Sequence, residues 1–146
     1  MAKTTAADPV PAIVEAEATG DTRAHFADIR VTLGVPVVNL IWRHLATMPG
    51  ALDWAWTVLK PLFEQGVIAD QARALNASIT LPSGMITPGA LDADTLSAAG
   101  LTSTDVKQIE MILRSYARSN AMNIIAVGTL GAHLTGKADI DLERPA

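Results

Sequence analysis

Apolar residues recur every three to four positions along most of the chain, which is the period of an amphipathic α-helix. Glycine and proline separate the helical segments. A first helix, capped by Asp21 or Thr22, ends at Gly34, and a second begins at Pro36. Proline suits the first turn of a helix because the N–H that it lacks would be unpaired there in any case. The pattern therefore predicts two helices joined by a sharp break.

The rest of the chain continues this pattern. Further helices are expected from Pro49 or Gly50, over 68–79, over 92–99, from Thr102 to a break at Ser119–Asn120, and over 122–134. Pro61 should kink the third helix or end it one turn early, and Thr102 with Asp105 resembles a capping box. No alternation typical of strands is present. We predict an all-α fold, a compact bundle of about six to seven helices.

Three segments are expected: an extended N-terminal arm over 1–20, a single helical domain over 21–136 and a polar C-terminal tail over 137–146. Within the domain, residues 81–89 are expected to form one long irregular loop. Loops of that length often carry function. A chain of 146 residues suffices for one domain with a substantial core.

Composition narrows the classes of partner. The net charge of −4 leaves no basic surface for nucleic acid. The absence of cysteine excludes disulfides, thiolate metal sites and a cysteine nucleophile. The most apolar run, 121–134, is too short to span a bilayer. We expect a cytoplasmic protein without a signal peptide or membrane partner, whose 49% apolar residues are buried or meet another subunit.

The second helix is the first place to look for a site, because its broad apolar arc predicts burial while it carries Asn39, Arg43 and His44. Buried polar groups need partners or a function. Asn39 and Arg43 are four residues apart and share one helical face, where together they could bind a small carboxylate near the helix N-terminus. The alternative is a solvated strip, or Arg43 paired with Asp28.

Other candidates are more ambiguous. His44 is either a core histidine with satisfied hydrogen bonds or a catalyst, and Asp28 is a base, an arginine partner or an exposed carboxylate. Asn120 and Asn123 open the last helix, where they would cap it or position water or substrate. Trp42 is a core or interface residue and a candidate for substrate binding. No histidine spacing is typical of a metal site, so no metal or cofactor is expected.

Several short motifs point to a known family. They are Glu15-Ala-Glu-Ala-Thr-Gly, Asp28-Ile-Arg, Leu33-Gly-Val-Pro-Val, Leu45-Ala-Thr-Met-Pro-Gly, and Asn120 after Tyr116. With these motifs, nearly the whole chain resembles one repeat of the group I, non-stereospecific 2-haloacid dehalogenases. That family is all-α and has two tandem repeats, related by a pseudo-twofold axis, with the active site between them. In its reaction an aspartate activates water, which displaces halide directly at the carbon alpha to the carboxylate.

The resemblance implies a hydrolase acting on a small 2-halo-acid-like substrate. Because one repeat is present, it also implies a homodimer with a true twofold axis and a pocket at the interface. Asn120 matches the water-positioning amide of the family, with Arg43 holding the carboxylate. Asn39 stands where the catalytic aspartate is expected, and an amide cannot take a proton from water, so Asp28 or His44 would be the base. The alternatives are a hydrolase of epoxide-like electrophiles and a non-catalytic helical ligand-binding protein.

Overall fold

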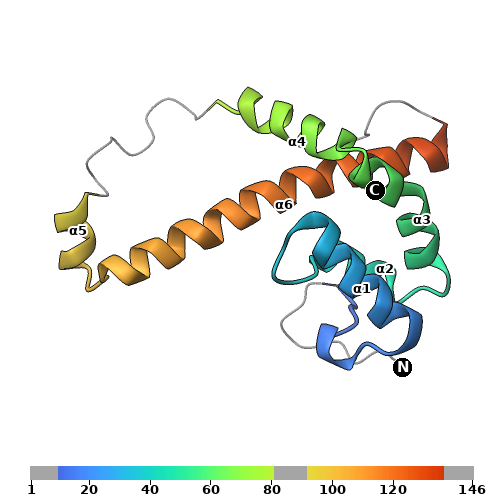
Figure 1. Cartoon of the computed structure of the whole chain (residues 1–146), viewed down its shortest axis with the longest axis horizontal. Coiled ribbons are helices and arrows are strands. Elements are labelled where there is room, and N and C mark those ends of the chain that lie inside the picture. The colour runs from blue at the N-terminus through green and yellow to red at the C-terminus, as the bar shows by residue number, and fades with distance from the viewer. Residues whose placement is uncertain (1–9, 81–91, 137–146) are drawn as a thin grey trace.

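A computed structural model describes residues 10–80 and 92–136, and every regular element in these ranges is a helix. The elements are a 3₁₀ helix, η1 (Glu15–Glu17), and the α-helices α1 (Gly20–Leu33), α2 (Leu40–Leu45), α3 (Ala51–Glu64), α4 (Val67–Ser78), α5 (Ala93–Ala98) and α6 (Ser103–Thr135) (Figure 1). The predicted all-α fold is confirmed. The loop expected over 81–89 and the tail from 137 lie outside the described residues.

The core lies where α1, α2, α3 and α4 meet the C-terminal half of α6. Three aromatic rings occupy its centre. Trp42 of α2 packs edge-on against Trp56 of α3, with 5.7 Å between ring centroids, and Trp56 also packs on Phe63 at 5.6 Å. Such ring pairs add stability beyond the burial of their area. They attach the short α2 to α3, and both tryptophans are therefore core residues.

The break after α1 is at Gly34, as predicted. Its φ of 65° lies in the left-handed region, which glycine adopts without the steric cost that a Cβ would bring. Its backbone N–H closes the end of α1 on the carbonyl of Val31. The chain can therefore turn sharply into an extended segment.

The second helix is shorter than predicted, because it begins at Leu40 rather than Pro36. The cause lies elsewhere in the sequence. The carboxylate of Glu15 accepts a hydrogen bond from the backbone N–H of Val38 (2.9 Å), while its other oxygen pairs with Arg30 (2.6 Å). This contact holds the residues after Pro36 outside the helix. Asn39 consequently lies at the N-cap with extended backbone angles, φ −60° and ψ 151°.

The break expected at Ser119–Asn120 does not exist, and α6 runs through it for 33 residues, or about 50 Å. Ser119 is buried, and its hydroxyl accepts a hydrogen bond from the side-chain amide of Asn39 at 3.3 Å. Tertiary contacts therefore hold a weak helix former inside the helix. At the start of α6 the predicted capping box of Thr102 and Asp105 is present.

Two smaller findings complete the fold. Pro61 does not end α3 early, because the helix continues to Glu64. The N-terminal half of α6 extends away from the other helices toward α5 (Figure 1). No helix of the described ranges combines the length and the apolar character that a membrane crossing requires.

Candidate functional site

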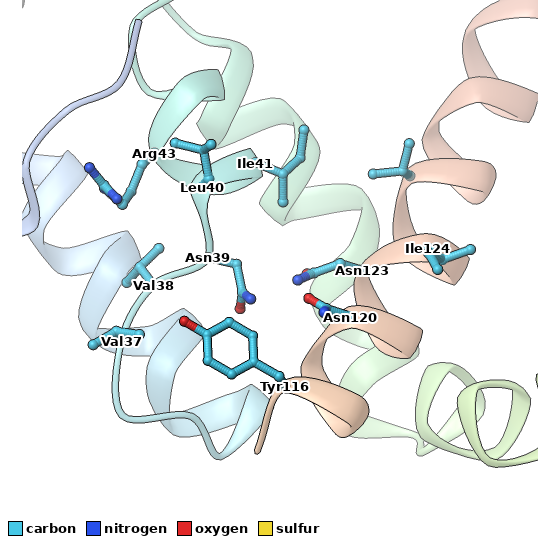
Figure 2. Close-up of a pocket in the computed structure, with 11 residues that line it drawn as sticks. Val37, Val38, Asn39, Leu40, Ile41, Arg43, Tyr116, Asn120, Asn123 and Ile124 are labelled. Atoms are coloured by element: carbon cyan, nitrogen blue, oxygen red, sulfur yellow. The ribbon is translucent and has the colours of Figure 1, made fainter. Parts of the chain in front are cut away.

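A pocket of about 770 Å³ lies between the start of α2 and the C-terminal half of α6. Its lining is apolar except for one tyrosine, one arginine and three asparagines: Val37, Val38, Asn39, Leu40, Ile41, Arg43, Tyr116, Asn120, Asn123, Ile124 and Val127. Figure 2 shows Asn39 facing Asn120 and Asn123 across this space, with Tyr116 beside them. An apolar hollow with a few convergent polar groups is typical of a site for a small molecule.

Among the described residues, Asn39 carries the one buried side-chain polar atom that has no hydrogen-bond partner. Its Nδ2 donates to Ser119, but its buried Oδ1 accepts no hydrogen bond from any described residue. A buried carbonyl oxygen left without a donor costs about 1–3 kcal/mol. A ligand or a water molecule in the pocket would remove this cost. The Oδ1 of Asn39 is therefore a buried acceptor, without a donor among the described residues, on a residue that lines the pocket.

Asn123 is oriented by Trp42. The indole Nε1 donates to the Oδ1 of Asn123 at 3.1 Å, which occupies the oxygen of that amide and leaves its NH₂ group as the part available to a ligand. Trp42 itself is buried and does not line the pocket. The structure thus places this predicted substrate-binding residue behind Asn123, outside the pocket lining.

Arg43 lines the pocket at its edge, where the N-terminal arm holds it. Its Nε donates to the carbonyl of Ile13 at 2.9 Å, and its own carbonyl accepts from the N–H of Ile13 at 3.0 Å. Figure 2 shows the side chain directed away from the three amides. Arg43 therefore contributes a positive charge near the pocket, while its guanidinium is engaged by the arm.

Asp28 lies outside this pocket, between α1 and α3. Its Oδ2 accepts hydrogen bonds from Trp56 Nε1 and Lys60 Nζ, both at 2.7 Å. The hydrogen bond from Lys60, followed by that from Trp56, lowers the pKa of Asp28. A carboxylate that is stabilised in its ionised form is a weaker proton acceptor. The structure gives Asp28 the role of a partner that joins two helices.

His44 is also outside the pocket lining. Its Nδ1 lies 2.6 Å from the carbonyl oxygen of Pro11, so this nitrogen carries the proton and donates it. The described lining residues therefore include neither a carboxylate nor an imidazole. Among the described residues, no group of three His, Cys, Asp or Glu side chains could hold a metal ion.

Tyr116 is the pocket residue that sequence reasoning missed. Tyr116 falls on the apolar spacing of α6, which by itself indicates packing, and the predicted break at Ser119–Asn120 separates it from the asparagines. Because α6 is continuous, Tyr116 lies one turn before Asn120 and on the same face. The i, i+4 spacing of these two residues is the signal that would have found it.

The described residues form an all-α fold with a pocket of a size that suits a small molecule, and comparison with known proteins narrows this class. The chain is 31% identical over 112 residues, 73% of its length, to an (R)-2-haloacid dehalogenase of Pseudomonas putida. Over 41 residues, 28% of its length, it is 46% identical to an (R)-2-haloacid dehalogenase of Rhizobium sp. (strain NHG3). The matched parts make up 36% and 16% of these relatives.

The chain thus spans about a third of the length of the first relative. No family model matches the chain, and no solved structure matches it significantly. The similarity makes the chain a distant homologue of haloacid dehalogenases. Membership of the non-stereospecific group and the presence of a single repeat stay predictions, as do the roles of the site residues.

Proposed function

We propose that the chain acts as a hydrolase of the 2-haloacid dehalogenase type, in which water displaces halide from carbon 2 of a small 2-halo acid. Similarity to (R)-2-haloacid dehalogenases supports this class of reaction. The observation that carries the assignment to a site is the convergence of Asn39, Asn120 and Asn123 in one apolar pocket, from segments about 80 residues apart in the sequence.

The polar groups of the pocket suit such a substrate. The NH₂ groups of Asn120 and Asn123 and the hydroxyl of Tyr116 donate hydrogen bonds to the substrate carboxylate, and the charge of Arg43 attracts it to the pocket. The aliphatic side chains contact the halogen and the alkyl group. Asn39 Oδ1, which accepts no hydrogen bond from the described residues, accepts one from the attacking water and orients its lone pair toward carbon 2.

The displacement forms one bond and breaks one. The water oxygen bonds to carbon 2, the carbon–halogen bond breaks, and the halide leaves with the bonding electrons. Because the described lining has no carboxylate or imidazole, hydroxide from the solvent takes the proton. A positioned base typically contributes about 10²–10⁴-fold to a rate, so slow turnover is expected. We leave Asp28 and His44, the bases predicted from the sequence, out of this step because neither lines the pocket.

The test is halide release from the separate enantiomers of 2-chloropropionate. Asn39→Ala and Asn120→Ala should each lower the rate at least about tenfold, since each removes a group that orients water or substrate. Met111→Ala, on an exposed position of α6 outside the pocket, is the matched control. No release above buffer, or equal loss in all three variants, would contradict the proposal. An uncharged epoxide of similar size tests the need for a carboxylate.

The pH dependence of halide release distinguishes proton transfer to hydroxide from proton transfer to a base of the protein. Without a base in the pocket, halide release should increase about tenfold per pH unit above neutrality, because the concentration of hydroxide does so. A bound imidazole or carboxylate base would instead give a rate that levels off above its own pKa. A plateau abolished by His44→Gln or Asp28→Asn would restore that residue as the base.

A second candidate function is a non-catalytic ligand-binding protein on the same scaffold. The neutral lining of the pocket favours it, since amides bind a carboxylate without providing a base. Titration calorimetry with lactate and 2-chloropropionate distinguishes the two candidates. Binding of both acids that is lost in Asn120→Ala, without release of halide at any pH, would support the binding protein.

A further inference from the structure

A second hollow, of about 360 Å³, lies between α4 and α6 and shares no described lining residue with the candidate site. We call it the arginine pocket, because its lining consists of three arginines, one asparagine, three alanines and a methionine. Figure 1 shows α4 lying beside α6. Small side chains on both helices, such as Ala72 and Ala117, leave between them a space that larger side chains would fill.

The arginine pocket concentrates positive charge on a chain whose net charge is −4. Arg73, Arg114 and Arg118 are three of its 11 lysines and arginines, and the described lining contains no acidic residue. Arg73 pairs with Asp70 on its own helix. Arg114 and Arg118 form no ion pair with a described residue. Like charges four residues apart destabilise a helix, so an anion in the pocket would stabilise this part of α6.

The guanidinium of Arg118 is held in place by the end of α1. Its Nη2 lies 3.4 Å from the position that a Cβ would occupy at Gly34, so the absence of a side chain there leaves room for it. The negative end of the dipole of α1 favours a cation at this place. That reason applies to Arg118 alone, since Arg114 lies one turn earlier on α6. The fold therefore orients one guanidinium of the pocket before any ligand binds.

Asn76 is the neutral polar residue of the arginine pocket. Its Nδ2 donates a hydrogen bond to the backbone carbonyl of Ala117 at 3.3 Å, which joins α4 to α6 and orients the amide. A side-chain amide has two N–H donors, and this bond uses one of them. The second donor is therefore available to an oxygen atom of a ligand, beside the three guanidinium groups.

The chemistry of this lining favours a phosphoryl group. All three cations are arginines, whose planar forks bind carboxylates and phosphates with two hydrogen bonds each. A monocarboxylate has one charge and two oxygens, which suffice for one fork. The phosphoryl group of a phosphate monoester has two charges near pH 7 and three terminal oxygens, so it suits Arg114 and Arg118 together. A nucleic acid would instead need cations distributed along its backbone, whereas these are confined to one hollow.

We propose that the arginine pocket binds a phosphate monoester, with Arg114 and Arg118 as the main contacts of the phosphoryl group and with Arg73 and Asn76 beside them. The volume of about 360 Å³ leaves room for a small organic group on the ester oxygen. Because the two pockets share no described lining residue, this site stands independently of the proposed function.

Titration calorimetry with glycerol 3-phosphate at low salt tests the site without reference to halide release. Arg114→Gln and Arg118→Gln should each weaken binding at least about tenfold, because each removes charge-assisted hydrogen bonds. Arg23→Gln is the matched control, since it makes the same change at an exposed position of α1 outside the lining, and it should bind like the wild type. No binding by the wild type, or equal weakening in all three folded variants, overturns the proposal.

Ala117→Leu distinguishes a shaped pocket from diffuse attraction to surface charge. The variant keeps every charge but fills part of the hollow, so it should also weaken binding about tenfold; unchanged binding overturns the pocket as the site. Succinate tests the choice of a phosphoryl group, and succinate that binds as tightly as the ester overturns that choice. Vesicles containing phosphatidic acid separate the two sources of a phosphate monoester. Sedimentation with them that Arg114→Gln abolishes supports a lipid headgroup, and binding of the soluble ester alone supports a metabolite.

Discussion

The two halves of α6 are both rich in apolar residues, yet their surroundings are opposite. The C-terminal half buries Ala121, Met122, Ala126 and Leu130 against α3 and α4. In the N-terminal half, Ile109, Ile112 and Leu113 are all exposed. Apolar content alone therefore does not decide burial; the presence of a neighbouring element does. One half of α6 completes a core within the chain, while the other half keeps its apolar side chains exposed in the described structure.

The largest expected effect is on the free energy of unfolding, at the packed C-terminal half of α6. Trp42→Ala should lower the free energy of unfolding by about 3–5 kcal/mol, because it removes a buried side chain that contacts Trp56 and holds Asn123. Met111→Ala, at an exposed position, should change it by less than about 0.5 kcal/mol. Urea unfolding measures both. A similar decrease in the free energy of unfolding of the two variants would contradict the difference between the two halves of α6.

The next expected effect is on the melting temperature, and it concerns the exposed N-terminal half of α6. If two copies of the chain associate through the exposed side chains of Ile109, Ile112 and Leu113, the melting temperature of the wild type should increase with protein concentration, because association stabilises the folded chain by mass action. A tenfold change in the concentration of chains adds about 1.4 kcal/mol of stability per mole of dimer. The melting temperature of Leu113→Glu should stay constant over the same range of protein concentrations. Scanning calorimetry at several concentrations measures this, and a wild-type melting temperature that does not vary would contradict the dimer.

The smallest expected effect on the free energy of unfolding is at the ion pair of Asp28 and Lys60. Both side chains are 37% exposed, so solvent screens the pair, and Asp28→Asn should cost about 1 kcal/mol at pH 7. Because folding lowers the pKa of Asp28 from 3.8, its contribution is complete above pH 3.8 and is lost as pH falls through the folded-state pKa. The wild type and the variant should therefore converge in stability in acid.

Asp28→Asn also tests whether Asp28 takes part in the candidate site. Asp28→Asn should leave the rate of halide release unchanged in the folded protein, because Asp28 does not line the pocket. A loss of halide release larger than the loss of folded protein, measured by circular dichroism on the same samples, would contradict its purely structural role.

Several features could be predicted because they depend on neighbours in the sequence. The left-handed Gly34 ends α1, and the capping box of Thr102 and Asp105 begins α6. Each requires only groups within about one helical turn, so residue type and spacing suffice to predict it. The all-α class follows from the same short-range periodicity.

The pocket could be predicted only in part. Asn39, Arg43, Asn120 and Asn123 were named from the sequence, and all four line it, whereas Tyr116 was hidden by a break in α6 that does not exist. That break was expected because Ser and Asn are weak helix formers. The hydrogen bond from Asn39 to the buried Ser119 crosses 80 residues, and no local pattern contains it.

The amino-acid sequence by itself determined the all-α class, the end of α1 at Gly34 and the start of α6 at Thr102, since these depend on interactions over a few residues. It also supplied the amides that line the pocket. Tertiary structure decided where α2 begins, because Glu15 takes the N–H of Val38. It also removed Asp28 and His44 from the pocket by giving each a partner elsewhere. Those outcomes depend on contacts between residues that are distant in sequence, and only the folded chain brings them together.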